Sequence, residues 1–300
     1  MRDDDFAGAQ LVRAVSTKPR ARAPTVALLA GSALWGLNWW PLQRFAQAGV
    51  GIAALTAVCY AVLAVAALPF LWRQRRGCRA QPRRALAIMV CGGWANAAFI
   101  GALAAGDVTR VMLLFYLAPV WSVIAGRLLL HEPVVRRRLV AVVLALFGAV
   151  LALGHGAARP FAVADALALS AGVAFALNNV ALRSADALPQ GSKNALVFVG
   201  ALLAGAGASV VLAQPLPTAS VLGPLLVYAF VWLGLANLAV QYGVSHMHAG
   251  RAGVLLASEL VIAIGSAALL GATVIDSRRL LGGGLILIAT VLEARAGAEG

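Results

Sequence analysis

Several polar side chains that could contact a ligand lie inside long apolar segments of this sequence. Glu259 lies about a third to halfway along one such segment, and Asn38 and Asn178 interrupt two others. A polar group in hydrocarbon costs several kcal/mol unless it is paired, so each one needs a partner or a cavity. A carboxyl there could bind a substrate or carry a proton, and an amide both donates and accepts hydrogen bonds. The sequence therefore predicts either ligand chemistry within the membrane or hydrogen bonds between neighbouring helices.

The candidate site combines amides, one carboxyl and aromatic rings. In one apolar segment Asn237, Gln241 and Ser245 recur every four residues, which places them on one helix face. Aromatic rings suit the wall of a cavity for flat or apolar ligands, but they also anchor helices at membrane interfaces, which is our interpretation of Trp72. The predicted substrate-binding residues are Asn38, Trp39, Trp94, Asn96, Tyr116, Asn178, Asn237, Gln241 and Glu259.

The composition requires a membrane environment for these residues. Hydrophobic residues make up 62% of the 300 positions and charged residues 12%, unlike a soluble domain. The loops between the apolar stretches are short, so they leave no room for a water-soluble catalytic domain. We predict an all-α integral membrane protein with ten transmembrane helices, at 25–44, 51–72, 85–106, 110–130, 138–155, 163–183, 193–213, 220–243, 251–271 and 279–296.

Lysine and arginine predict the orientation. Of the 24 such residues, nineteen lie on the side that holds both termini and five on the other side. Because positive loops stay cytoplasmic, we expect a multi-pass inner-membrane protein with cytoplasmic N- and C-termini. The same bias accounts for the net charge of +13, so no nucleic-acid partner is predicted.

The sequence repeats at a spacing close to half its length. Arg110 corresponds to Arg251 at a shift of 141, and Asn38 corresponds to Asn178 at a shift of 140. Five spans in each half mean that the second half enters the membrane in the opposite orientation. The predicted organisation is a basic cytoplasmic tail at 1–24, a first five-helix repeat at 25–155 and an inverted second repeat at 163–296.

No catalytic motif is present. Walker, HExxH, GxSxG and EF-hand patterns are absent, and the three cysteines have neither CxxC spacing nor a disulfide pattern. We therefore expect no enzyme activity, no cofactor and no metal. The alternative, an intramembrane enzyme acting on a lipid, would rely on His131 and Glu132, which lie in a turn beside Pro133.

Two stretches resemble a known family. One stretch is Trp35-Gly36-Leu37-Asn38, and the other runs from Tyr116 to Val120 and on to Leu128 to Pro133. Through these two stretches the sequence resembles the drug/metabolite transporter superfamily of the EamA type. The resemblance implies a central cavity lined by spans 1, 3, 4, 6, 8 and 9, and export of small metabolites by alternating access. The aromatic residues favour amino acids, aromatic ones first, as the small-molecule substrate. Proton coupling and the choice between monomer and homodimer stay open.

Pro119 distinguishes the two halves of the sequence. Its counterpart in the second half is Leu260, where the family usually has proline after the glutamate. Because proline removes a backbone donor and bends a helix, we expect a bend in the first half only.

Overall fold

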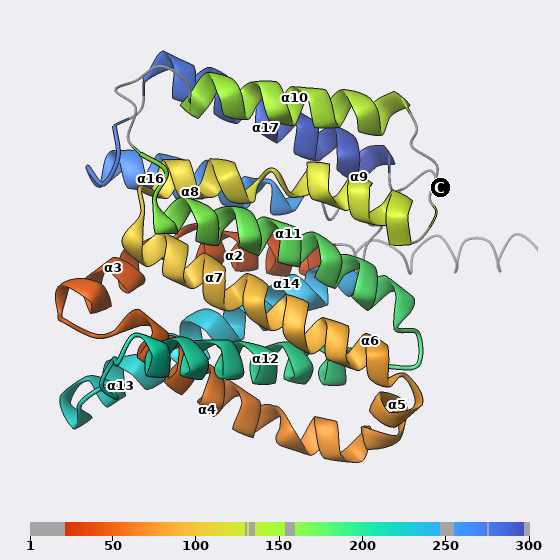
Figure 1. Cartoon of the computed structure of the whole chain (residues 1–300), viewed down its shortest axis with the longest axis vertical. Coiled ribbons are helices and arrows are strands. Elements are labelled where there is room, and N and C mark those ends of the chain that lie inside the picture. Colours follow the sequence, from red (N-terminus) through yellow and green to blue (C-terminus); the bar gives the residue numbers. More distant parts are fainter. Residues whose placement is uncertain are drawn as a thin grey trace, which may run out of the picture.

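The computed structural model describes residues 22–129, 131, 136–153, 160–246, 255–274 and 276–296. All regular secondary structure in these ranges is helical (Figure 1), as the composition predicts. Three of the positions used in the sequence analysis, Arg251, Glu132 and Pro133, lie outside these ranges, as does the predicted basic tail except for its last three residues.

The first half of the chain forms helices that are interrupted at short turns. In order they are α2 (Arg22–Gly36), α3 (Trp39–Gln47), α4 (Ile52–Arg73), α5 (Arg75–Ala80), α6 (Pro82–Ala87), η1 (Ile88–Gly92), α7 (Gly93–Ala105), α8 (Val108–Phe115), α9 (Ala118–Leu129) and α10 (Arg136–Leu153). The second half comprises α11 (Val163–Ser184), α12 (Gln190–Val211), α13 (Ala219–Val227), η2 (Tyr228–Gly234), α14 (Leu235–Ser245), α16 (Ser258–Leu269) and α17 (Ser277–Ala296).

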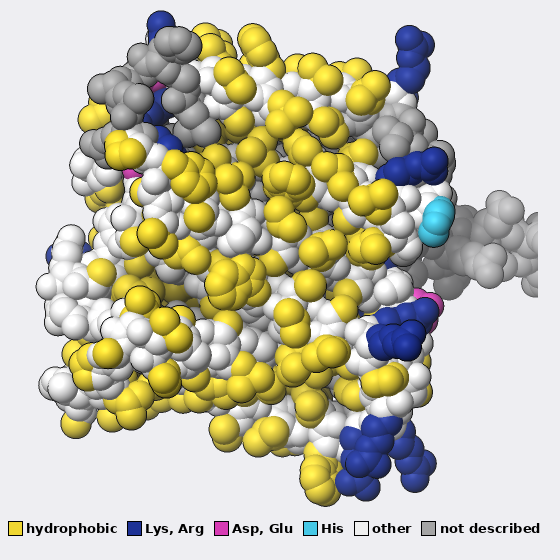
Figure 2. Space-filling view, in the orientation of Figure 1, with side chains coloured by type: hydrophobic (Ala, Val, Ile, Leu, Met, Phe, Trp, Pro, Cys, Tyr) yellow, Lys and Arg dark blue, Asp and Glu magenta, His cyan; other side chains and the backbone are white. Residues whose placement is uncertain are grey.

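Six helical segments of the described residues are long and apolar enough to cross a membrane. Each overlaps one of the ten predicted spans. Of the other four, the predicted span at 25–44 is divided between α2 and α3, the one at 279–296 corresponds to α17, and two are represented by shorter apolar helices, Leu139–Ala152 and Ser258–Leu269. Hydrophobic side chains cover much of the face seen in Figure 2, as expected for contact with lipid. The six segments are Ile52–Arg73, Pro82–Ala105, Val108–Leu129, Val163–Ser184, Gln190–Val211 and Ala219–Val244.

Four helix pairs organise the bundle, and each pair joins the first half of the chain to the second. Helix α10 packs on α17, and α4 packs on α12, at opposite ends of the molecule in Figure 1. Between them lie the pairs α7 with α11 and α2 with α14. The main hydrophobic core includes buried residues of α4, α7, α8, α10, α11, α12 and α17.

Glycines permit the closest helix crossings. A Cβ at Gly200 of α12 would clash with the Met89 carbonyl of η1, and one at Gly282 of α17 would clash with the Gly148 carbonyl of α10. Small residues let membrane helices approach to backbone contact, where van der Waals packing and weak hydrogen bonds stabilise them. The abundant glycine of the sequence therefore serves helix packing at these crossings.

Two helical segments are broken at positions 140 or 141 residues apart. Helix α8 ends at Phe115 and α9 begins at Ala118, while residues 255 and 256 are helical, Ala257 is in a turn and α16 begins at Ser258. The prediction of a bend in the first half only is therefore wrong. The second break needs no proline because side chains satisfy the carbonyls beside it: the Ser258 hydroxyl donates to Leu255 O at 2.6 Å, and the Tyr116 hydroxyl donates to Leu256 O at 3.2 Å.

Two π-helical segments share the same spacing. They are η1 and η2, and their first residues, Ile88 and Tyr228, are 140 positions apart. In each case an asparagine amide donates to a carbonyl four residues earlier, from Asn96 to Gly92 O at 2.9 Å and from Asn237 to Leu233 O at 2.7 Å. A π turn disrupts the regular hydrogen-bond ladder, and these amides satisfy carbonyls next to the disruption.

Candidate functional site

Asn38 lies at the break between α2 and α3 and is completely buried. Its Oδ1 accepts a hydrogen bond of 2.8 Å from the hydroxyl of Tyr228, the first residue of η2. Its Nδ2 has no hydrogen-bond partner among the described residues. Such a buried donor is costly when it is left unsatisfied, so a group that accepted a hydrogen bond from it would stabilise this region.

Trp39 joins α3 to α16. It is almost fully buried, and its Nε1 donates a hydrogen bond of 3.0 Å to the Ser266 hydroxyl. That hydroxyl donates in turn to Ala263 O at 3.1 Å. The indole donor is therefore already used inside the protein, and what Trp39 offers to a ligand is its ring.

Glu259 lies where broken helices of both halves meet. It occupies the first turn of α16 and is partly exposed. Its carboxyl interacts with the Tyr116 hydroxyl at the α8–α9 break. Its backbone carbonyl lies against the end of α2, where a Cβ on Gly36 would be 2.8 Å from it. The helix start favours a negative charge at this position.

A chain of aromatic rings runs through this region. Trp35 of α2 lies 6.3 Å from Phe99 of α7, whose ring centroid is 4.4 Å from that of Phe115 on α8. The Phe115 ring also contacts Tyr116 and Phe175, each at 5.6 Å. The three phenylalanines were not among the predicted site residues, although Phe175 corresponds to Trp35 at the repeat shift of 140 and could have been found in that way.

Trp94 of α7 lies on an exposed face of its helix. Its side chain is 41% exposed, on the same helix face as exposed Leu86 and Val90, which precede it by eight and four residues. Its Nε1 donates to the Ser170 hydroxyl of α11 at 3.2 Å. A role of Trp94 in a cavity stays a prediction.

The remaining predicted amides lie near the two π-helical segments. The Oδ1 of Asn96 accepts a hydrogen bond of 2.8 Å from the Tyr60 hydroxyl, and its Nδ2 donates to Gly92 O, so both polar atoms of this amide have partners within the protein. Asn178 lies against Gly92 and is buried, and its Oδ1 has no partner in the described part of the chain. Asn237 and Gln241 follow one another by one turn on α14, both partly buried. These contacts make Asn96 the most structural of the four asparagines.

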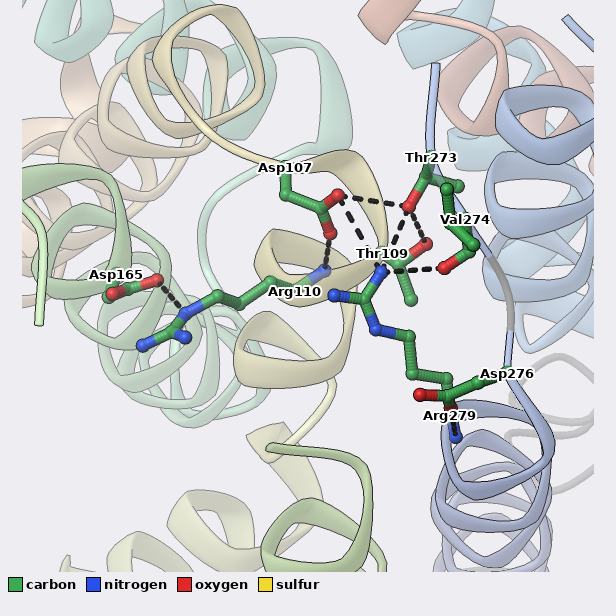
Figure 3. Close-up of polar contacts among 8 residues, drawn as sticks. All are labelled: Asp107, Thr109, Arg110, Asp165, Thr273, Val274, Asp276 and Arg279. Atoms are coloured by element: carbon green, nitrogen blue, oxygen red, sulfur yellow. Dashed lines mark hydrogen bonds and ion pairs between the residues drawn. The ribbon is translucent and has the colours of Figure 1, made fainter. Parts of the chain in front are cut away.

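A polar network that was not predicted joins both halves at one end of the bundle (Figure 3). Asp107 caps α8, where its Oδ1 accepts from Arg110 N at 2.9 Å. Its Oδ2 accepts from the Thr273 hydroxyl at 2.9 Å and lies 3.8 Å from Arg279 Nη1. Thr109 donates to Thr273 at 3.1 Å. First-half residues thus bind the segment between α16 and α17.

A second ion pair ties α8 to α11 in the same network. Arg110 Nε donates to Asp165 Oδ1 at 2.6 Å, and Ala162 N donates to Asp165 Oδ2 at 2.9 Å. The sequence offers one signal for this network, an aspartate three residues before an arginine at 107–110 and again at 276–279. Both aspartates accept from the backbone N–H of the arginine, which is helix-start geometry.

Comparison with known proteins finds one matching family model. Residues 24–154 match the model of the EamA-like transporter family. The first half of the chain is therefore similar to the EamA-like transporter family. The match confirms the resemblance drawn from the sequence and, together with the apolar helices, indicates a multi-pass membrane protein of a transporter type.

A solved structure agrees with this fold. A protein titled only "Crystal structure of protein" aligns with a TM-score of 0.62 and 18% identity, over 93% of this chain and 98% of the other. At that identity the likeness concerns the fold alone. No curated protein matches the chain.

Proposed function

We propose that the chain is a secondary transporter that exports amino acids with aromatic or other apolar side chains across the inner membrane by alternating access. The observation that carries the proposal is the position of Glu259 beside Tyr116, at broken helices of both halves and next to the aromatic chain. We also propose cytoplasmic termini, in line with the distribution of arginine and lysine.

The proposed architecture is ten spans in two inverted repeats, at 25–155 and 163–296. Three features support it. Each major helix pair joins the two halves, the π segments recur at a spacing of 140, and the breaks at Tyr116–Leu117 and Ala257 recur at 140 or 141. Broken helices near the centre of repeated halves are typical of substrate sites in secondary transporters.

The site offers complementary partners for a zwitterion. The Glu259 carboxylate suits an ammonium group, and the adjacent aromatic rings add attraction for a cation and apolar contact for the side chain. The substrate carboxylate is suited by the free Asn38 amide donor and by the starts of α3 and α9, because helix starts carry partial positive charge.

The network in Figure 3 supports a two-state cycle. Its bonds connect Asp107, Thr109 and Arg110 of the first half to Asp165, Thr273 and Arg279 of the second half. In alternating access these contacts hold one end closed and separate when that end opens.

Counterflow of labelled amino acids into liposomes tests the proposal. Glu259→Gln removes the charge at nearly constant size, and the loss of a charge-assisted hydrogen bond predicts roughly 10- to 100-fold weaker uptake. The matched control is Asp186→Asn, on the exposed α11–α12 loop, which should transport normally. Normal uptake by the Glu259 variant would remove Glu259 from the site, and absence of flux for a broad amino-acid panel would refute this substrate class.

Proton coupling is measured in the same vesicles. If Glu259 carries a proton during the cycle, an imposed pH gradient drives uptake in the wild type and fails to drive it in Glu259→Gln. A wild type that ignores the gradient is a facilitated exchanger.

A further inference from the structure

Six arginines gather at one end of the helix bundle. Dark blue side chains cluster at the lower right of Figure 2, where Figure 1 labels α5 and α6. Helix α5 lies between the candidate spans Ile52–Arg73 and Pro82–Ala105, and α6 begins the second of them, so the arginines lie at a boundary between membrane and water. The six are Arg73, Arg75, Arg76, Arg79, Arg83 and Arg84.

The charge of this arginine cluster is not neutralised by the part of the protein that the structure describes. The sequence contains no Asp or Glu from Phe6 to Gly106, and none of the six arginines forms an ion pair with a carboxylate of the described residues. The facing α11–α12 loop contributes one carboxyl, Asp186, which interacts with Lys193. Six adjacent cations without a described carboxylate partner attract anions from the surroundings.

The arginine cluster lies beside exposed aromatic side chains, a combination that suits contact with lipid headgroups. Trp72, at the end of α4, is 72% exposed, and the Arg75 guanidinium lies over its ring, 4.7 Å from the centroid. Phe70, two residues earlier, is also exposed. Tryptophan rings sit at the headgroup level of bilayers, and the planar guanidinium binds phosphate with two parallel hydrogen bonds.

The segment that carries these arginines also contacts the second half of the chain. The Ser192 hydroxyl donates to the Gln74 side chain, and Gly77 of α5 packs so closely on Ala187 that a Cβ would be 2.8 Å from its carbonyl. The α5 segment is thus held in place by the α11–α12 loop. Its arginines are presented from a fixed platform rather than from a free loop.

We propose that Arg75, Arg79 and Trp72 form a binding site for the phosphate headgroup of an anionic phospholipid. The two arginines are four residues apart on one face of α5, and Trp72 places the site at the acyl–headgroup boundary. Clusters of four to eight basic residues beside a membrane helix attract anionic lipid in this way.

Quenching of Trp72 by brominated lipid tests the proposal. The protein is placed in phosphatidylcholine nanodiscs with either brominated phosphatidylglycerol or brominated phosphatidylcholine at equal mole fraction, and the Trp72 signal is the difference between wild type and Trp72→Phe. We expect half-maximal quenching at a roughly tenfold lower fraction of the anionic quencher. Equal quenching by the two lipids would overturn the site.

Matched double variants separate a site from general surface charge. Arg75→Gln with Arg79→Gln should abolish the preference, whereas Arg127→Gln with Arg136→Gln removes the same charge elsewhere and should retain it. Equal loss in both doubles would overturn the proposal. The double variant Arg75→Lys with Arg79→Lys keeps the charge, so it tests the proposal even if the glutamine double variant misfolds. A several-fold weaker preference for the anionic lipid supports recognition by the guanidinium groups, and an unchanged preference refutes it.

Discussion

The ion pair between Arg110 and Asp165 allows a quantitative test of the contact between the two halves. The Asp165 side chain is 4% exposed and Arg110 is 24% exposed. Arg110→Gln removes the 2.6 Å bond and leaves a buried carboxylate that, among the described residues, keeps the hydrogen bond from Ala162 N. Breaking a buried pair from one side costs about 3–5 kcal/mol, and partial exposure of the arginine lowers our expectation to about 2–3 kcal/mol.

The opposite change should cost less. Asp165→Asn keeps an acceptor for Ala162 N and leaves a guanidinium that solvent reaches, so we expect a loss of about 1 kcal/mol. The double variant should lose little more than Arg110→Gln alone or even less, because it no longer buries an unpaired charge. The expected coupling in the double-mutant cycle is therefore about 1–2 kcal/mol.

Thermal unfolding of the purified protein in detergent provides the measurement. At about 2–4 °C per kcal/mol, Arg110→Gln should lower Tm by roughly 4–12 °C. The reasoning is refuted if the double variant loses the sum of the two single losses, since additivity would mean that the two side chains do not interact. It is also refuted if Asp165→Asn lowers Tm more than Arg110→Gln does.

Two further substitutions test packing and the buried amide. Gly200→Ala drives a Cβ into the Met89 carbonyl and should lower the free energy of unfolding by about 1–3 kcal/mol. The control Gly284→Ala has open space around it and should leave Tm unchanged or slightly raised. Equal Tm values for the two variants would contradict the close crossing. Tyr228→Phe removes the donor to the buried Asn38 Oδ1 and should cost about 1–3 kcal/mol, so an unchanged Tm would mean that this bond contributes nothing.

The helices were largely predictable, and their breaks only partly. Long apolar runs predicted the candidate spans because a backbone in lipid must satisfy its own hydrogen bonds, and the helix is the local way to do so. The break at Ala257 was missed because no proline or glycine marks it. It depends on the hydroxyl of Tyr116, which is 140 residues distant from the carbonyl it binds.

The candidate site shows the same division. The polar residues in apolar runs were recognisable as a set, because each is costly in lipid. Their partners were not recognisable: Trp39 binds a hydroxyl 227 positions away, and Asn96 turns its amide to its own helix. The network around Asp107 was missed because its residues lie in short loops far apart in the sequence, and only helix packing brings them within hydrogen-bond distance.

The sequence alone determined the membrane environment, the helical class and the resemblance to the EamA-like transporter family, because these depend on composition, on the length of apolar runs and on local motifs. The tertiary structure decided which polar atoms are paired, which helices break and which side chains lie beside Glu259. These depend on distances between segments of different halves, such as the 2.6 Å between Arg110 and Asp165, and hydrogen-bond strength falls steeply with distance and angle. Hydropathy specifies that a helix is buried, whereas packing specifies what it touches.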